Sequence, residues 1–101
     1  MKNYTILINQ DALQDIRDAT DWYNFKANGL GNEFKKQVIS QISSLRKNPS
    51  IYAIRYADVR CLVIKNYPFL VHFTVDEANY LVNVFAVFHT SRNPLIWQGR
   101  L

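Results

Sequence analysis

The feature that most constrains the fold is a β-type run over residues 80–88, Y-L-V-N-V-F-A-V-F. Side chains alternate between the two faces of a strand. Unbroken alternation would give one face Val82, Val84, Ala86 and Phe88, and the other face Leu81, Asn83, Phe85, Val87 and His89. Both faces are largely apolar, which is typical of a strand inside a sheet. The run ends in the segment H-T-S-R-N-P (residues 89–94), so reactive and anion-binding side chains lie at the exit of this strand.

The N-terminal part predicts a short strand followed by a helix. Residues 4–8 are apolar and rich in β-branched side chains, which indicates a strand. From residue 11 the apolar period becomes helical, with Ala12, Ile16, Ala19, Tyr23 and Ala27 on one face. Asp11 and Gln14 are spaced for a capping box at the start of this helix, and the Asn28-Gly29 pair predicts its end.

A second helix and three strands complete the expected fold. Residues 30–45 place Leu30, Phe34, Val38, Ile42 and Leu45 on one helix face, and so short a link makes the two helices an antiparallel hairpin. Residues 59–65, 69–75 and 80–88 then form an antiparallel meander with short turns. The prediction is a single α+β domain over residues 1–101, with the element order β-α-α-β-β-β. The helix hairpin would cover one face of the sheet formed by the C-terminal strands and the N-terminal strand.

Composition excludes several classes of function. Only one cysteine and two histidines occur, a poor set for a metal site, and a lone cysteine forms no internal disulfide. None of the three glycines belongs to a phosphate-loop pattern, so we expect neither a metal nor a nucleotide cofactor. No apolar stretch reaches the length of a membrane span, and no signal peptide is apparent. We therefore expect a cytoplasmic protein without a membrane partner.

Charge is distributed unevenly along the chain. Residues 1–33 carry three basic and five acidic side chains, whereas residues 34–101 carry nine basic and three acidic ones. The whole chain has a formal net charge of +4. This asymmetry favours a polyanionic partner, either nucleic acid or an acidic protein segment, over a surface that is merely solvated.

Three features of the chain occur together: the element order β-α-α-β-β-β, the Tyr67-Pro68-Phe69 turn, and the ending V-F-H-T-S-R-N-P (residues 87–94) with Trp97. In this combination the chain resembles the RelE/ParE toxin superfamily. The resemblance implies the toxin of a type II toxin–antitoxin pair, related to plasmid-stabilisation proteins and silenced by a cognate antitoxin. RelE-like members cut mRNA on the ribosome, and ParE-like members inhibit DNA gyrase.

The ending of the chain is more similar to the ParE branch than to the RelE branch. No tyrosine follows Tyr80, and His72 stands where many ribonuclease members have an arginine. The resemblance therefore favours a gyrase inhibitor slightly. A ribosome-dependent endoribonuclease and an inactive binding module with the toxin fold remain alternatives.

RNA cleavage without a metal needs groups that move two protons and cations that stabilise the phosphate. The candidate catalytic residues are His89 as acid or base, with Arg60, Lys65 and Arg92 as phosphate ligands. Each has a structural alternative: a strand cap for His89, a tether of the C-terminal segment for Arg92, and solvated charges for Arg60 and Lys65. His72 is interpreted as a packing or hydrogen-bonded side chain.

Aromatic side chains away from the main helix stripe suggest a second contact surface. Trp22 and Phe25 lie off the apolar face of the first helix, so they are candidates for antitoxin docking. The alternative is that they pack beneath the C-terminal segment. Pro94 and Trp97 are interpreted as anchors of that segment.

Overall fold

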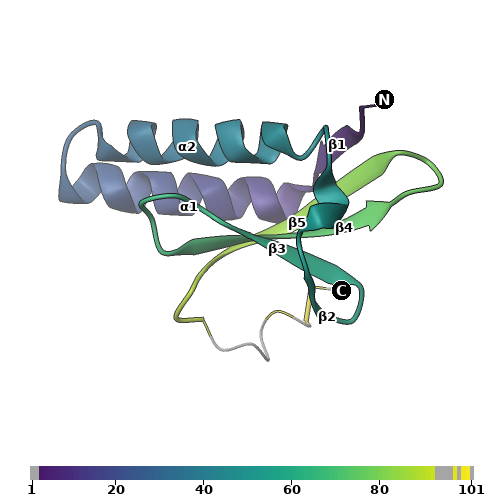
Figure 1. Cartoon of the computed structure of the whole chain (residues 1–101). Helices are drawn as coiled ribbons and strands as arrows, with labels where there is room; N and C mark the ends of the chain where they lie inside the picture. The colour runs from purple at the N-terminus through teal and green to yellow at the C-terminus, as the bar shows by residue number, and fades with distance from the viewer. Residues whose placement is uncertain (1–2, 93–96, 98, 101) are drawn as a thin grey trace.

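A computed structural model describes residues 3–92, 97 and 99–100 of the chain. Two helices lie together on one side of a twisted sheet (Figure 1). The elements in chain order are β1 (Thr5–Ile8), α1 (Gln10–Lys26), α2 (Leu30–Ser44), the 3-10 helix η1 (Pro49–Ile51), β2 (Ile54–Tyr56), β3 (Val59–Val63), β4 (Phe69–Asp76) and β5 (Leu81–His89). The α+β architecture and the element order are confirmed, with β2 as one strand more than the sequence predicted.

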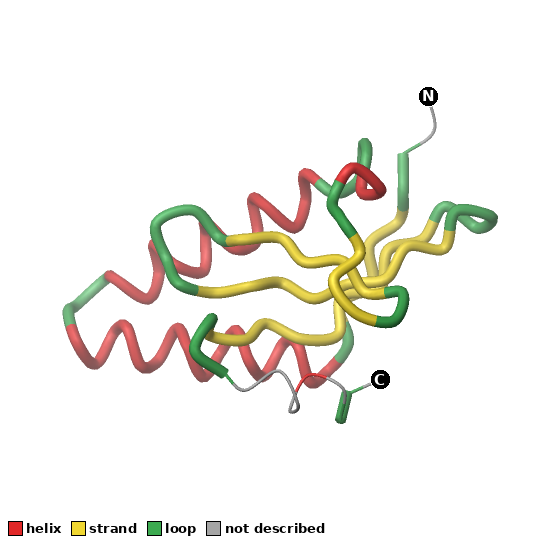
Figure 2. Tube along the Cα trace, turned by 60° about the horizontal axis from the view of Figure 1, so that its bottom comes forward, coloured by secondary structure: helices red, strands yellow, loops and turns green. Residues whose placement is uncertain are grey.

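The five strands form one sheet in the order β1-β5-β4-β3-β2. As predicted, β5 is an interior strand, flanked by β1 and β4. β1 runs parallel to β5, while β5, β4, β3 and β2 are joined antiparallel. A parallel pair needs a long crossover connection, and here the helix hairpin supplies it (Figure 2).

The main core lies between the helix hairpin and the sheet. The predicted helix stripes are buried there, including Ala12, Ile16 and Ala19 of α1 and Phe34, Val38 and Ile42 of α2. They pack against strand residues such as Phe73 and Val84, both fully buried. Within the part of the chain that the structure describes, no helix is long and apolar enough to cross a membrane.

Gly31 permits the close approach of the two helices. Its N–H donates to Asn24 Oδ1 at 2.8 Å. A Cβ atom at this position would lie 2.1 Å from the backbone oxygen of Thr20, far inside van der Waals contact. The connection just before it uses Gly29 at a φ of 85°, a left-handed conformation that glycine adopts at little cost.

The predicted capping box at Asp11 and Gln14 is wrong. The helix starts earlier, at Gln10, and its N-cap is Asn9, whose Oδ1 accepts a hydrogen bond from Ala12 N–H at 2.9 Å. Asn9 N–H itself donates to Val84 C=O at 3.0 Å. The chain therefore leaves β1 and enters α1 within one residue, which leaves Asp11 inside the first turn.

The predicted face assignment of the last strand is also wrong beyond Val84. A β-bulge interrupts the β4–β5 ladder, because Phe73 pairs with Val84 but His72 pairs with Ala86. The extra residue shifts the alternation. Val82, Val84 and Val87 belong to the main core, whereas Phe85, Ala86 and Phe88 belong to a second apolar cluster. The bulge thus brings Val87 to the helix-covered face, and His89 follows two residues later.

The second cluster comprises Val59, Phe85, Ala86 and Phe88, with Tyr56 and Trp97 packed against it. Trp97 stacks near Tyr56 and His72, with ring centres 5.6 and 4.7 Å apart respectively. The interpretation of Trp97 as an anchor of the C-terminal segment is confirmed. Pro94, the other predicted anchor, lies outside the described residues.

The sequence did not predict β2, because it is a three-residue edge strand without a clear alternation of apolar and polar side chains. It is joined to β3 by a tight turn in which Ala57 has a φ of 47°. Its register with β3 shifts between Ile54 and Tyr56.

Candidate functional site

A pocket of about 280 Å³ lies between α1 and the ends of β4 and β5 that meet at His89. Its lining combines apolar side chains with side chains of both signs of charge. The residues that line it are Asp15, Asp18, Ala19, Trp22, Phe69, Val87, His89 and Arg92. Of the four candidate catalytic residues, the structure brings His89 and Arg92 together in this pocket.

His89 is the last residue of β5 and its side chain is exposed. Its ring meets the Phe69 ring edge-on, with centres 5.2 Å apart. Ser91 N–H donates to His89 Nδ1 at 3.0 Å, and Ser91 Oγ lies 2.7 Å from the same nitrogen. Because Nδ1 accepts from a backbone N–H, the neutral imidazole carries its proton on Nε2. His89 therefore offers a hydrogen-bond donor, and its accepting nitrogen is already engaged.

Arg92 follows in the same turn, where its backbone N–H donates to His89 C=O at 3.0 Å. Its guanidinium carbon lies 5.2 Å from the centre of the Phe88 ring. The side chain is exposed, and the ion pairs found among residues 3–92, 97 and 99–100 do not include it. It is thus an available cation at the rim of the pocket.

Arg60 is not part of this site. It lies on β3 opposite Phe73 of β4, and Phe73 is four residues along β4 from Phe69, the partner of His89, or roughly 13 Å at the usual rise of a strand. Its guanidinium donates to the backbone oxygens of Ser50, at 3.0 Å, and Tyr52. The side chain therefore ties the segment around η1 to the sheet, a structural use of the charge.

Lys65 lies at the same end of the sheet as His89 but does not line the pocket. It follows β3, and β4 separates it from β5. Its backbone N–H donates to Gln41 Oε1 at 2.7 Å, while its side chain is exposed. The sequence indicated that Lys65 and His89 lie at or near strand ends, but it did not reveal the order of the strands in the sheet.

The predicted partner surface is exposed. Trp22 is 55% and Phe25 86% exposed. Trp22 forms one wall of the pocket, and Lys26 Nζ lies 5.1 Å from its ring centre. Phe25, one helical turn further, lies outside the pocket lining.

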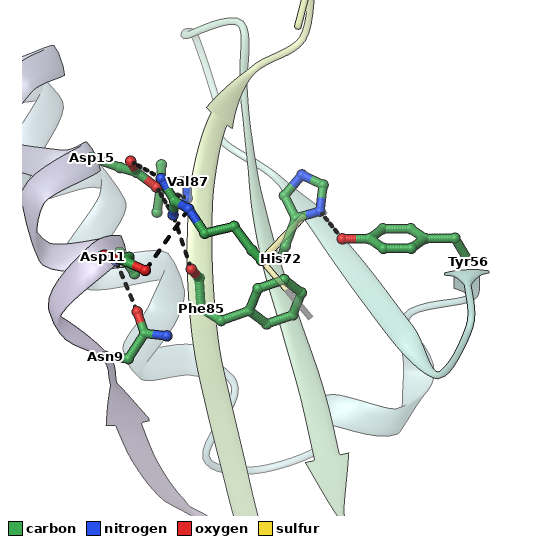
Figure 3. Close-up of polar contacts among 9 residues, drawn as sticks. Asn9, Asp11, Asp15, Tyr56, His72, Phe85 and Val87 are labelled. Carbon is green, nitrogen blue, oxygen red and sulfur yellow. Dashed lines mark hydrogen bonds and ion pairs between the residues drawn. The ribbon is translucent and has the colours of Figure 1, made fainter. Parts of the chain in front are cut away.

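Sequence reasoning missed the two carboxylates of the pocket, Asp15 and Asp18. Asp15 pairs with Arg100 through two hydrogen bonds of 2.8 and 2.9 Å, and it also accepts from Val87 N–H at 2.9 Å. Arg100 in turn donates to Phe85 C=O at 3.1 Å. Figure 3 shows Asp15 reaching from α1 to the edge of β5 at Val87. The hydrogen bond to Asp15 is the main reason why the pKa of Arg100 is raised above its ordinary value.

This Asp15–Arg100 pair acts as a substitute for a neighbouring strand. β1 ends opposite Val84, so the rest of β5 has a free edge on that side. The pair accepts one backbone N–H and donates to one backbone C=O there, as an added strand would. The two residues are 85 positions apart, and no local pattern in the sequence connects them.

His72 lies on the other face of the sheet and takes no part in the pocket. It is fully buried, and the Tyr56 hydroxyl lies 2.9 Å from its Nδ1 (Figure 3). Burial is the main cause that lowers the pKa of His72 to about 4. The interpretation of His72 as a packing and hydrogen-bonded residue is confirmed. Among the described residues, no group of three histidine, cysteine or acidic side chains is placed to hold a metal ion.

The pocket can bind a ligand that carries negative charge at one end. Arg92 and the Nε2–H of His89 are donors suited to an anion. Asp18 is an acceptor, and Trp22 with Phe69 offers aromatic surface. Proton transfer would need His89 to act as a base through Nδ1, where Ser91 already donates, or as an acid from Nε2 in the imidazolium form, in which Nδ1 can no longer accept from Ser91.

Residues 6–94 match the family model described as the ParE toxin of the type II toxin–antitoxin system parDE. No curated protein matches the sequence. The fold is similar to the chromosomal ParDE toxin–antitoxin system from P. aeruginosa, with a TM-score of 0.77 and 16% identity over 87% of this chain and 97% of the other.

Two RelE structures from E. coli have the same fold. A RelE variant in the free state gives a TM-score of 0.69 at 15% identity, covering 96% of this chain and 93% of the other. The intact RelBE toxin–antitoxin complex gives 0.66 at 16% identity, covering 88% and 99%. The resemblance to the RelE/ParE superfamily is therefore confirmed on the ParE side. The family model spans most of the sequence, and the chain belongs to the ParE toxin family, as the toxin component of a type II toxin–antitoxin system.

Proposed function

We propose that this toxin arrests growth in the cytoplasm by binding DNA gyrase, and that it inhibits through a surface rather than by catalysis. The observation that carries the proposal is the separation of the candidate catalytic side chains. Arg60 is engaged by backbone oxygens away from the pocket, and Lys65 lies outside it. Metal-free RNA cleavage needs acid, base and phosphate ligands around one reacting group. Membership in the ParE family supports the same choice.

A supercoiling assay with purified gyrase tests the proposal. The full chain should inhibit DNA supercoiling, and His89→Ala should still inhibit, because a binding surface does not depend on one titratable group. Arg60→Ala is unsuitable as a surface variant, since it frees two backbone oxygens. Absence of inhibition by the unaltered chain at equimolar or higher concentration would refute the gyrase target.

The alternative is a ribosome-dependent endoribonuclease, and one observation favours it. His89 and Arg92 share a pocket, so His89 in its imidazolium form could protonate the leaving 5′-oxygen from Nε2 and become neutral, while the guanidinium binds the phosphate. The imidazolium would give up the hydrogen bond that Nδ1 accepts from Ser91 N–H. On this alternative His89→Gln abolishes mRNA cleavage on ribosomes and leaves the fold intact. Loss of translation before DNA synthesis in cells would support it, whereas absence of any growth defect would indicate an inactive binding module.

We also propose that the cognate antitoxin covers Trp22 and Phe25. Large exposed aromatic side chains on one helix are a common anchor for a protein partner. Replacing either by Ala should weaken the complex by about tenfold or more. Ile39→Ala, at a 40% exposed position on α2, is the matched control and should leave the affinity unchanged. Equal loss in all three variants would contradict the assignment.

A further inference from the structure

We infer that the pocket between α1 and the end of β5 binds a nucleotide unit, with the base against Trp22 and the phosphate at Arg92. The inference concerns direct binding of nucleic acid by the toxin and so goes beyond the proposed inhibition of gyrase. It rests on the combination of charges and aromatic surface in one cavity, which no single residue supplies.

The size and lining of the cavity suit one planar base. A volume of about 280 Å³ is at the lower end for small-molecule sites, large enough for a base and too small for a folded peptide element. Ala19, Phe69 and Val87 supply apolar surface, and Trp22 keeps half of its side chain exposed. Bases stack on such aromatic side chains regardless of their identity.

The anion-binding end is formed by the turn that follows β5. Arg92 has no acidic partner in the described part of the chain. In His89, Nδ1 accepts from Ser91 N–H, so the neutral ring has its donor, Nε2–H, available for a ligand. A guanidinium and an imidazole N–H three residues apart are suitable donors for one phosphate group. The backbone bonds from Thr90 N–H to Pro68 C=O (2.8 Å) and from Arg92 N–H to His89 C=O (3.0 Å) hold this turn in place.

The opposite wall selects against a purely anionic ligand. Asp15 is neutralised by Arg100, but Asp18 accepts a single hydrogen bond, from Gln14 Nε2 at 2.8 Å, and makes no ion pair within the described ranges. A carboxylate has room for further donors. An acidic peptide would be repelled here, whereas a base presents N–H groups to Asp18 and leaves its phosphate at Arg92.

This arrangement predicts a base preference. Guanine offers two adjacent N–H donors on its Watson–Crick edge, which match the two oxygens of a carboxylate, whereas uracil offers one. The pocket should therefore prefer guanine, and Asp18 should be the origin of the preference. Recognition through side chains also explains why no glycine-rich phosphate loop is needed.

The test uses the purified full chain. Binding of GMP and UMP is measured by calorimetry, and binding of fluorescently labelled single-stranded oligonucleotides of ten nucleotides is measured by fluorescence anisotropy. Trp22→Leu and Arg92→Ala should each weaken binding by about tenfold or more. The matched controls are Phe25→Ala, an exposed aromatic on the same helix, and Arg17→Ala, an exposed arginine outside this pocket. Both controls should bind within about twofold of the unaltered chain.

Two further measurements distinguish a free nucleotide from a base within a strand as the ligand, and test whether Asp18 causes the preference for guanine. Binding of GMP itself supports a free nucleotide as ligand, and binding of strands alone supports an unpaired base within a strand. Asp18→Asn should remove the preference for guanine without removing binding. The inference is overturned if neither nucleotides nor strands bind, or if the two control variants weaken binding as much as Trp22→Leu and Arg92→Ala do. Neither result depends on gyrase.

Discussion

Removal of the Asp15 carboxylate should destabilise the fold through the free edge of β5. The Asp15 side chain is only 12% exposed, and it accepts hydrogen bonds from Val87 N–H and from two nitrogens of Arg100. Asp15→Ala leaves the Val87 N–H unpaired, at about 1–3 kcal/mol. It also breaks an ion pair whose arginine is partly exposed, worth about 1 kcal/mol after solvent screening. We expect a loss of about 2–4 kcal/mol in the free energy of unfolding.

Urea unfolding of the Asp15 variants, of a double-mutant cycle and of one control separates these contributions. Asp15→Asn retains an acceptor for Val87 N–H and should lose only about 1 kcal/mol, the charged part of the interaction. A double-mutant cycle with Arg100→Gln should give a coupling energy of about 1 kcal/mol. Asp18→Asn, an exposed carboxylate on the same helix, is the control and should change stability by less than about 0.5 kcal/mol. If Asp15→Ala is no less stable than Asp15→Asn, the strand-edge argument is refuted.

Three further predictions concern the helices and the buried histidine. Gly31→Ala should lose about 1–3 kcal/mol in urea unfolding, because its Cβ would overlap the Thr20 carbonyl oxygen; unchanged stability would contradict that contact. Asn9→Ala should lose about 1 kcal/mol by removing the α1 cap, while Asn9→Asp should retain most of it. Burial lowers the folded-state pKa of His72 to about 4, below its ordinary 6.5. The contribution of the neutral ring to the free energy of unfolding is therefore complete above pH 6.5, and it decreases by about 3 kcal/mol as the pH falls toward 4. Replacing His72 by Gln should flatten the stability profile between pH 6.5 and 4, and an unchanged profile would refute the assignment.

The sequence predicted those parts of the fold that rest on periodicity. The helical stripes are buried as expected, since a helix has one apolar face and few ways to cover it. The interior position of β5 followed from its two apolar faces. β2 did not follow, because three residues on a sheet edge carry no readable period.

The candidate site was predictable only in part. His89 and Arg92 lie in one turn, so their proximity is a local property of the sequence. Their orientation depends on the bulge at Phe85, which unbroken alternation could not reveal. The pairing of Asp15 with Arg100 depends on tertiary contact across most of the chain. Arg60 appeared as a free cation because backbone acceptors leave no signature in sequence.

The central claim, a toxin that acts on gyrase, is tested most directly by inducible expression in bacteria with pulse labels for DNA and protein synthesis. The account predicts that DNA synthesis falls first while translation continues, and that His89→Ala behaves in the same way. An early loss of translation that His89→Ala prevents would contradict it and would identify the chain as a ribonuclease.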